Sequence, residues 1–207
     1  MKTIFLFFSV ILTILPFSIQ TLAQSEYRIV ILGDSLTDGY GLSKEQAFPA
    51  IVEKMFHEDG KKNVKIINAG ISGSTSSSAK QRLNWFLKSK PQMLAVALGA
   101  NDGLRGLPIE NLIQNLSETV ESAQKAGIRV VLFGMKMPPN YGPKYQKDFE
   151  QAFVKVAQKY KIERLDFLLD GVATVKELNL EDRIHPNEKG HQVIAKNVYS
   201  FLKKLVP

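Results

Sequence analysis

Short apolar runs alternate with amphipathic stretches along most of the chain and predict alternating strands and helices. Four runs rich in aliphatic and β-branched residues, at 27–32, 64–67, 93–98 and 128–133, are typical of buried strands. A fifth run, at 162–167, predicts one more strand. Between these runs, apolar residues recur three and four positions apart, which is the spacing of one face of a helix.

The amphipathic stretches predict five helices, over 48–56, 78–88, 109–123, 145–160 and from 187 to 205. Gly60 and Gly127 stand where the first and third of these helices are expected to end. Strand and helix alternate without a repeat or a linker. This order predicts an α/β fold: a three-layer α/β/α sandwich around a doubly wound, mainly parallel, five-stranded sheet of flavodoxin-like type.

The first 23 residues differ from the rest. Met1 and Lys2 precede an apolar stretch over 4–19, and Thr21-Leu22-Ala23 supplies the small-x-Ala pattern that signal peptidase accepts. A retained membrane anchor is the less favoured alternative, because Pro16 and the polar residues after it leave little apolar length for about 30 Å of hydrocarbon. We expect a signal peptide over 1–23, one domain over 24–207, and a periplasmic or secreted protein.

Composition narrows the function classes. The sequence contains no cysteine, so it can be neither a lipoprotein tethered through an acylated cysteine nor a disulfide-stapled fold. The formal charge is +7, but the basic residues are scattered and form no stripe, which argues against binding of nucleic acid. Such a charge leaves room for at most peripheral contact with membranes.

Polar loops follow the first three predicted strands. In doubly wound sheets, ligands bind at the carboxyl ends of the strands. Gly33-Asp34-Ser35 places a serine hydroxyl just after the first strand, and the glycine-rich loop over 68–76 offers backbone N–H groups that can face a developing negative charge. Asn101 supplies a side-chain amide after the third strand. Each loop alone is also typical of an ordinary turn, but three in succession indicate a site.

A carboxylate and an imidazole lie close together near the carboxyl end of the chain. Asp182 precedes His185 by three residues, and Pro186 and Asn187 follow at the expected start of the last helix. A serine hydroxyl is a weak nucleophile until a base takes its proton, and that base needs a third group to fix its tautomer. Taken alone, this segment fits a helix cap equally well.

In this order and at these separations, Ser35, Gly73, Asn101 and His185 resemble the four sequence blocks of the SGNH (GDSL) hydrolase superfamily. The resemblance implies Ser35 as the nucleophile, His185 as the base and Asp182 as the partner of that base. It also implies that the N–H groups of Ser35 and Gly73 and the amide of Asn101 form an oxyanion hole. The implied reaction is two-step acyl transfer, which needs neither a metal ion nor an organic cofactor.

Nearly the whole chain after residue 23 is similar to the exported bacterial acyl-CoA thioesterase I branch, also described as arylesterases and lysophospholipases. The similar stretches are 31–36, 71–73, 101–106, 140–145 and 182–187. The resemblance implies that Asp34, Leu104, Asn140 and Tyr141 contact the substrate. It implies action on small-molecule acyl esters, acyl thioesters or lysophospholipids. We expect the protein to be a monomer. Ser74 stands where this branch commonly has an acidic residue, so a preferred acyl length does not carry over.

Three alternatives remain. A carbohydrate acetyl esterase of the same superfamily would share the four blocks and differ only in its groove. A metallohydrolase would use His185, Glu188 and His191, but steps of three and six residues align ligands poorly on a helix, so His191 is expected to pack at the apolar face. His57 is expected to be solvated. A noncatalytic periplasmic binding module is compatible with the fold, but nucleophile, base and acid together argue against it.

Overall fold

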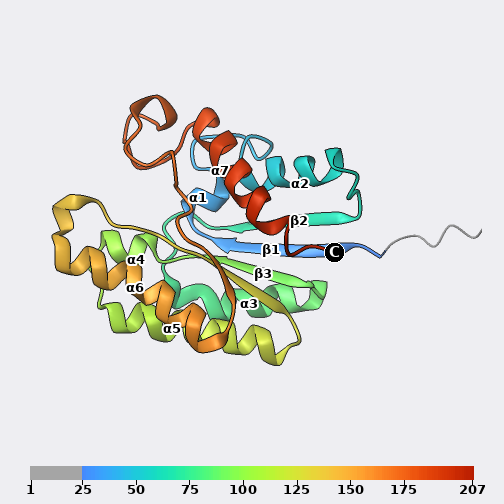
Figure 1. Ribbon diagram of the computed structural model, residues 1–207, viewed down its shortest axis with the longest axis horizontal. Coiled ribbons are helices and arrows are strands. Elements are labelled where there is room, and N and C mark those ends of the chain that lie inside the picture. Colours follow the sequence, from blue (N-terminus) through green and yellow to red (C-terminus); the bar gives the residue numbers. More distant parts are fainter. Residues whose placement is uncertain (1–24) are drawn as a thin grey trace, which may run out of the picture.

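The computed structural model describes residues 25–207, and the signal peptide predicted for 1–23 lies outside this range (Figure 1). Its five strands are β1 (Tyr27–Gly33), β2 (Val64–Gly70), β3 (Met93–Ala97), β4 (Arg129–Phe133) and β5 (Glu163–Leu165). They form one sheet in the order β2-β1-β3-β4-β5, and each neighbouring pair is parallel. The predicted α/β fold with a five-stranded, doubly wound sheet is confirmed.

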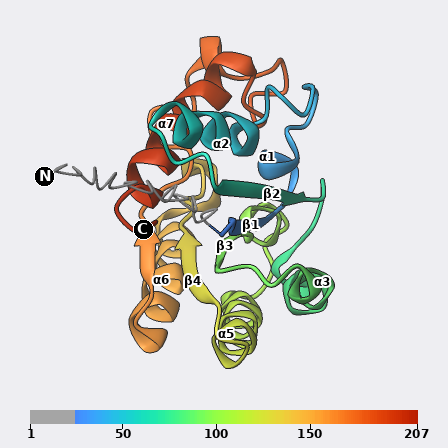
Figure 2. The ribbon, with the colours of Figure 1, turned by 90° about the vertical axis from the view of Figure 1, so that its right-hand side faces the viewer.

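Helices cover both faces of the sheet (Figure 2). On one face, α2 (Phe48–Glu58) packs against α7 (Glu188–Leu202). On the other face, α5 (Ile109–Lys125) lies between α3 (Ala79–Phe86) and α6 (Pro143–Tyr160). The face of α5 that the apolar spacing predicted is the buried one, with Leu112, Leu116 and Val120 against the sheet. Single turns of 3₁₀ helix, labelled η, are η1 (Ser76–Ser78), η2 (Leu87–Ser89), η3 (Pro139–Tyr141) and η4 (Lys176–Leu178).

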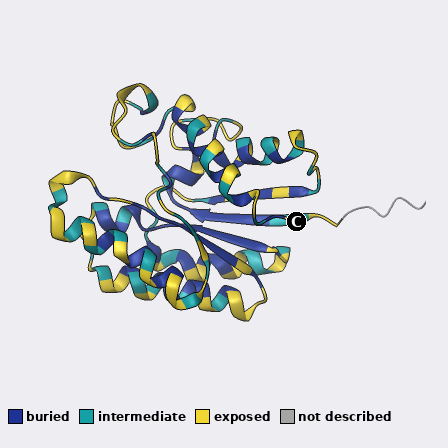
Figure 3. Cartoon of the chain, in the orientation of Figure 1, coloured by how far each residue is buried: buried dark blue, intermediate teal, exposed yellow. Residues whose placement is uncertain are grey.

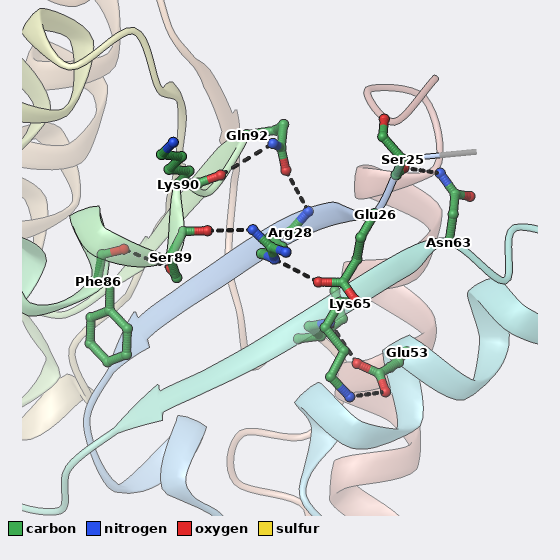
Figure 4. Close-up of polar contacts among 11 residues, drawn as sticks. Ser25, Glu26, Arg28, Glu53, Asn63, Lys65, Phe86, Ser89, Lys90 and Gln92 are labelled. Atoms are coloured by element: carbon green, nitrogen blue, oxygen red, sulfur yellow. Dashed lines mark hydrogen bonds and ion pairs between the residues drawn. The ribbon is translucent and has the colours of Figure 1, made fainter. Parts of the chain in front are cut away.

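The core lies on both sides of the two central strands (Figure 3). The side chains of 29–32 in β1 and 93–97 in β3 are all buried, which explains why both strands read as continuous apolar runs. Polar contacts gather at the amino-terminal edge of the sheet (Figure 4). There Arg28 donates from Nη1 to the carbonyl of Ser89 at 2.7 Å and pairs through Nε with Glu26 at 2.6 Å. Within residues 25–207, each helix is too short or too polar to cross a membrane.

Two short helices were not predicted. α1 (Ser35–Asp38) directly follows β1, and α4 (Ala100–Leu104) directly follows β3. Each is shorter than two turns, so its apolar spacing cannot be distinguished from that of a loop. Strand β5 is also shorter than the predicted run over 162–167, and α7 ends at Leu202 instead of 205.

The expectation for His57 was wrong. Its side chain is half-buried, and its Nε2 lies 2.8 Å from the carbonyl oxygen of Val64. The chain reverses at Gly60, where φ is +86°, and β2 therefore begins beside the end of α2. This reversal brings an acceptor to the imidazole and removes it from bulk solvent.

Gly70, at the end of β2, is a position where two backbones approach closely. A Cβ at Gly70 would overlap the backbone nitrogen of Asp38 and lie 2.6 Å from its Cα. Gly70→Ala must therefore displace α1, and we expect a loss of about 3 kcal/mol in the free energy of unfolding. Urea denaturation measures this loss.

Gly60→Ala is the matched control, because Gly60 has positive φ but nothing within 4 Å of its Cβ position. Its cost should be limited to the left-handed backbone, about 1 kcal/mol. Equal losses in the two variants would contradict the close approach of β2 and α1.

Candidate active site

Ser35 stands at the carboxyl end of β1 as the first residue of α1. Asp34 caps this helix, and its Oδ1 accepts a hydrogen bond from the backbone N–H of Leu36 at 3.0 Å. Below the cap, the buried guanidinium of Arg82 donates to the carbonyl of Gly33 at 2.9 Å and also to the carbonyl of Ala69. Arg82 thus ties the ends of β1 and β2 together under Ser35.

Ser35, His185 and Asp182 form one hydrogen-bonded chain. His185 Nε2 lies 2.9 Å from Ser35 Oγ, and His185 Nδ1 lies 2.7 Å from Asp182 Oδ2. Asp182 Oδ1 accepts from the backbone N–H groups of Ile184 and His185 at 2.9 and 3.0 Å. Arg183, at φ +58°, turns the chain between carboxylate and imidazole. The Asp182 carboxylate therefore both holds the backbone of this loop and orients the imidazole of His185.

The charge on Asp182 determines the tautomer of His185. Partial burial opposes ionisation of Asp182, but hydrogen bonds from His185 and Ile184 outweigh it and lower the pKa of this carboxyl to about 2. An ionised Asp182 accepts the proton of His185 Nδ1, which leaves Nε2 as the acceptor that faces Ser35. The ring of Tyr40 lies over the imidazole, with 4.4 Å between ring centroids.

The Gly73 loop lies beside Ser35. It is held there by bonds from Ile71 N–H to the carbonyl of Gly33 and from Ser72 Oγ to Asp38, at 3.2 and 2.7 Å. Neither Ser35 N–H nor Gly73 N–H has an acceptor among residues 25–207.

Asn101 contributes a third donor. Its Nδ2 donates one hydrogen to the carbonyl of Ser74 at 3.0 Å, which orients the amide and leaves the second hydrogen available. The structure thus gathers three N–H donors at the edge of the sheet that carries Ser35.

A cavity of about 450 Å³ opens at this edge. Five of the sequence-predicted residues line it, namely Asp34, Ser35, Asn101, Leu104 and His185. The other four, Gly73, Asn140, Tyr141 and Asp182, lie outside the lining. Tyr141 instead donates from its hydroxyl to the carbonyl of Leu104 at 2.9 Å. A depression of about 570 Å³ between β5 and α7 shares Lys136 and Phe167 with the cavity but contains neither Ser35 nor His185.

Most of the remaining lining is apolar and was missed in the sequence. These residues follow β4 and β5, or belong to the loop before α7: Met135, Met137, Pro138, Pro139, Phe167, Leu169, Ala173 and Ile184. Their position after predicted strands was the one sequence signal that could have indicated them. Segments that follow parallel strands come to the same edge of the sheet as Ser35.

Asp34 is a buried carboxyl in the wall of the cavity. Burial raises its pKa to about 6. The hydrogen bond from Leu36 N–H and the nearby His185 and Arg82 act in the opposite direction and lower this pKa, but burial outweighs them. Asp34 therefore changes its charge just below neutral pH, directly beside Ser35.

The structure does not bring His185, Glu188 and His191 together. His185 faces Ser35, Glu188 accepts from Gln46 Nε2 at 3.0 Å, and His191 Nδ1 accepts from the backbone N–H of Phe48 at 3.1 Å. Residues 25–207 contain no group of three His, Cys, Asp or Glu side chains suited to a metal ion. His191 is buried among helix contacts, as predicted from its place on the apolar face.

Residues 31–193 match the family described as GDSL-like Lipase/Acylhydrolase. The chain belongs to this family. It is 35% identical to Esterase TesA of Pseudomonas aeruginosa over 90% of this chain and 92% of that protein. It is 32% identical to Thioesterase 1/protease 1/lysophospholipase L1 of Escherichia coli K12, over 89% of this chain and 87% of that one.

A crystal structure of the psychrotrophic esterase EstA from Pseudoalteromonas sp., inhibited by monoethylphosphonate, is also similar. It has a TM-score of 0.83 and 34% identity, and covers 87% of this chain and 98% of the other. These matches confirm the resemblance to SGNH hydrolases and the predicted class of serine esterase.

The buried His191 makes stability depend on pH. Burial, with a contribution from His185, lowers the pKa of His191 to about 4, whereas an unfolded histidine titrates near 6.5. As the pH falls from about 6.5 to 4, the unfolded chain binds a proton that the folded chain resists, so this site removes up to about 3 kcal/mol of stability.

His191→Asn keeps an acceptor near Phe48 N–H but cannot be protonated. We expect wild type to lose its stability advantage over this variant between pH 7 and 4, as measured by urea unfolding. A constant difference between the two proteins over that range would contradict the buried neutral imidazole.

Proposed function

We propose that this protein hydrolyses esters and thioesters of apolar acyl groups by two-step acyl transfer through Ser35. The observation that carries the proposal is the hydrogen-bonded chain of Ser35, His185 and Asp182 at the mouth of an apolar cavity. Membership in the lipase/acylhydrolase family supports the reaction class. Relatives named as esterase and thioesterase support both kinds of bond.

In the first step, Ser35 Oγ attacks the acyl carbonyl carbon while His185 Nε2 takes the hydroxyl proton. The negative charge on the carbonyl oxygen receives hydrogen bonds from Ser35 N–H, Gly73 N–H and the Asn101 amide. The leaving alcohol or thiol takes the proton from His185. Water then attacks the acyl-Ser35 ester with His185 again as the base, and the free acid leaves.

The lining favours a fatty acyl group over an acetyl group on a sugar. Recognition of a sugar needs several free polar side chains, because unpaired hydroxyl groups are costly to bury. The lining is mainly apolar, and besides Asp34 and the residues of the reaction its polar residues are Lys136, Thr174, Asn179 and Arg183. The amide of Asn179 already donates to the carbonyls of Val172 and Val175 at 2.8 and 2.7 Å. Each methylene of an acyl chain that the apolar wall removes from water contributes about 0.8 kcal/mol to the binding free energy.

The leader-like sequence over 1–23 supports export to the periplasm or the medium, where the protein acts as a monomer on small-molecule substrates. Large apolar side chains of Tyr40, Ile71 and Ile184 are about half exposed. Tyr40 lies over the ring of His185, Ile184 precedes His185, and Ile71 belongs to the loop of Gly73. Their exposure supports peripheral contact with aggregated lipid substrates.

A rate profile of the mature protein tests the substrate class. With p-nitrophenyl esters from acetyl to palmitoyl, we expect kcat/KM to rise at least about 10-fold from acetyl to medium chains, because each buried methylene contributes binding free energy. Acyl-CoA and lysophospholipid are measured beside them. A maximum at acetyl, together with activity on acetylated sugars, would favour the carbohydrate esterase instead.

The nucleophile is tested with a fluorophosphonate probe, a chemistry related to the phosphonate inhibitor of EstA. Wild type should be labelled at Ser35, and Ser35→Ala should lose both labelling and hydrolysis. An adduct that maps to another serine would overturn the role of Ser35.

Asp182→Asn tests the orientation of the base. The Asn oxygen can still accept from Ile184 and His185 N–H, so the loop should keep its fold. The Asn amide would present a donor to His185 Nδ1 and favour the tautomer whose Nε2 carries a proton and cannot accept another. We expect kcat to fall by up to about 10⁴-fold while the protein stays folded, with a small decrease in melting temperature from the loss of the carboxylate charge. A variant with wild-type kcat would exclude this role for Asp182.

A further inference from the structure

The loop that carries Gly73 is held by side chains from one short segment, α4 and the residue that follows it. Arg105 Nη2 donates to the carbonyl of Gly73 at 2.9 Å, and Asn101 Nδ2 donates to the next carbonyl, that of Ser74, at 3.0 Å. Asp102 is buried and accepts from the N–H and hydroxyl of Ser76 at 2.8 and 2.6 Å. Residues 101–105 thus fix the backbone of 73–76 at three points.

We propose that Arg105 is a positioning residue of the oxyanion hole, which it holds in shape through the carbonyl of Gly73. This proposal rests on the proposed function, because it takes the Gly73 N–H as a donor to the substrate oxyanion. Arg105 itself has no part in the proton transfers, and it does not line the cavity.

The physical reason lies in the backbone of Gly73. Its φ is +78°, in the left-handed region, and glycine moves between backbone conformations more freely than any other residue. A small rotation at Gly73 would turn its N–H away from the place where negative charge develops. The hydrogen bond from the charged guanidinium to the Gly73 carbonyl opposes this rotation, and bonds from charged donors are stronger than neutral ones.

The exposure of the Arg105 side chain allows a positioning role in catalysis to be distinguished from a role in stability. Arg105 is exposed, so the loss of its side chain leaves no buried cavity and no unpaired buried charge. The loop also keeps its other attachments, through Asn101 and Asp102. The effect of Arg105 should therefore appear in turnover and leave stability nearly unchanged.

The experiment compares Arg105→Met, Arg105→Lys and the control Arg28→Met with p-nitrophenyl butyrate. This substrate carries no charge before it reacts, so Arg105 has no charged group to bind in the ground state. Arg28 makes the same kind of bond, from its guanidinium to the carbonyl of Ser89 at 2.7 Å, but at the opposite edge of the sheet (Figure 4). Urea midpoints of all variants are measured in parallel.

We expect Arg105→Met to lower kcat about 10-fold with little change in KM, a part of the 100- to 1,000-fold typical of losing an oxyanion donor outright. Arg105→Lys, which keeps a charged donor, should recover part of the rate, and Arg28→Met should keep wild-type kcat. The rate of labelling by a fluorophosphonate should fall in the same order, because its tetrahedral adduct uses the same hole.

Two outcomes would overturn the positioning role: wild-type kcat in Arg105→Met, or a defect confined to KM, which marks uniform substrate binding. If Arg105→Met fails to fold, the comparison of Arg105→Lys with wild type decides by the same split of kcat and KM. Failure of the proposed function is distinguishable, because in that case Ser35→Ala would retain the wild-type rate or wild type would not cleave the ester.

Discussion

All five strands of the sheet run in the same direction, and the site depends on this constraint. Parallel strands bring every carboxyl end to one edge, so the loops after β1, β2 and β3 place Ser35, Gly73 and Asn101 side by side. The segment after β4 adds Met137 to the wall of the cavity. His185 and Asp182 come from elsewhere, on the loop that enters α7, and α7 packs on α2.

The same constraint crowds one edge of the sheet with backbone carbonyl groups, which need donors. Side chains supply them: Arg82 for Gly33 and Ala69, Arg105 for Gly73, and Asn101 for Ser74. The N–H groups of Ser35 and Gly73, in contrast, have no acceptor in the described chain. The edge thus keeps its acceptors occupied and its donors free, which is the polarity that a developing anion requires.

The sequence predicted the sheet and the long helices because burial on a sheet or a helix face leaves a local period in the chain. It missed α1 and α4, because helices of four and five residues are too short to show a helical period in their apolar residues. Asp182 and His185 were expected as partners from the resemblance to SGNH hydrolases, because their three-residue spacing alone fits a helix cap equally well. The position of Tyr141 could not be foreseen, because a hydroxyl bond to the carbonyl of Leu104 leaves no trace in composition or spacing.

Ser35 and His185 are 150 residues apart in the sequence, and each lies near one end of the folded domain's chain. A polypeptide that emerges in order from a ribosome or a translocation channel presents Ser35 early and His185 almost last. In the proposed mechanism, Ser35 lacks its base until α7 docks on α2, whether or not the sheet has already formed. On this mechanism, a nascent or partly translocated chain cannot hydrolyse an ester. Recovery of hydrolysis during refolding therefore reports when the last helix docks, and not when the sheet assembles.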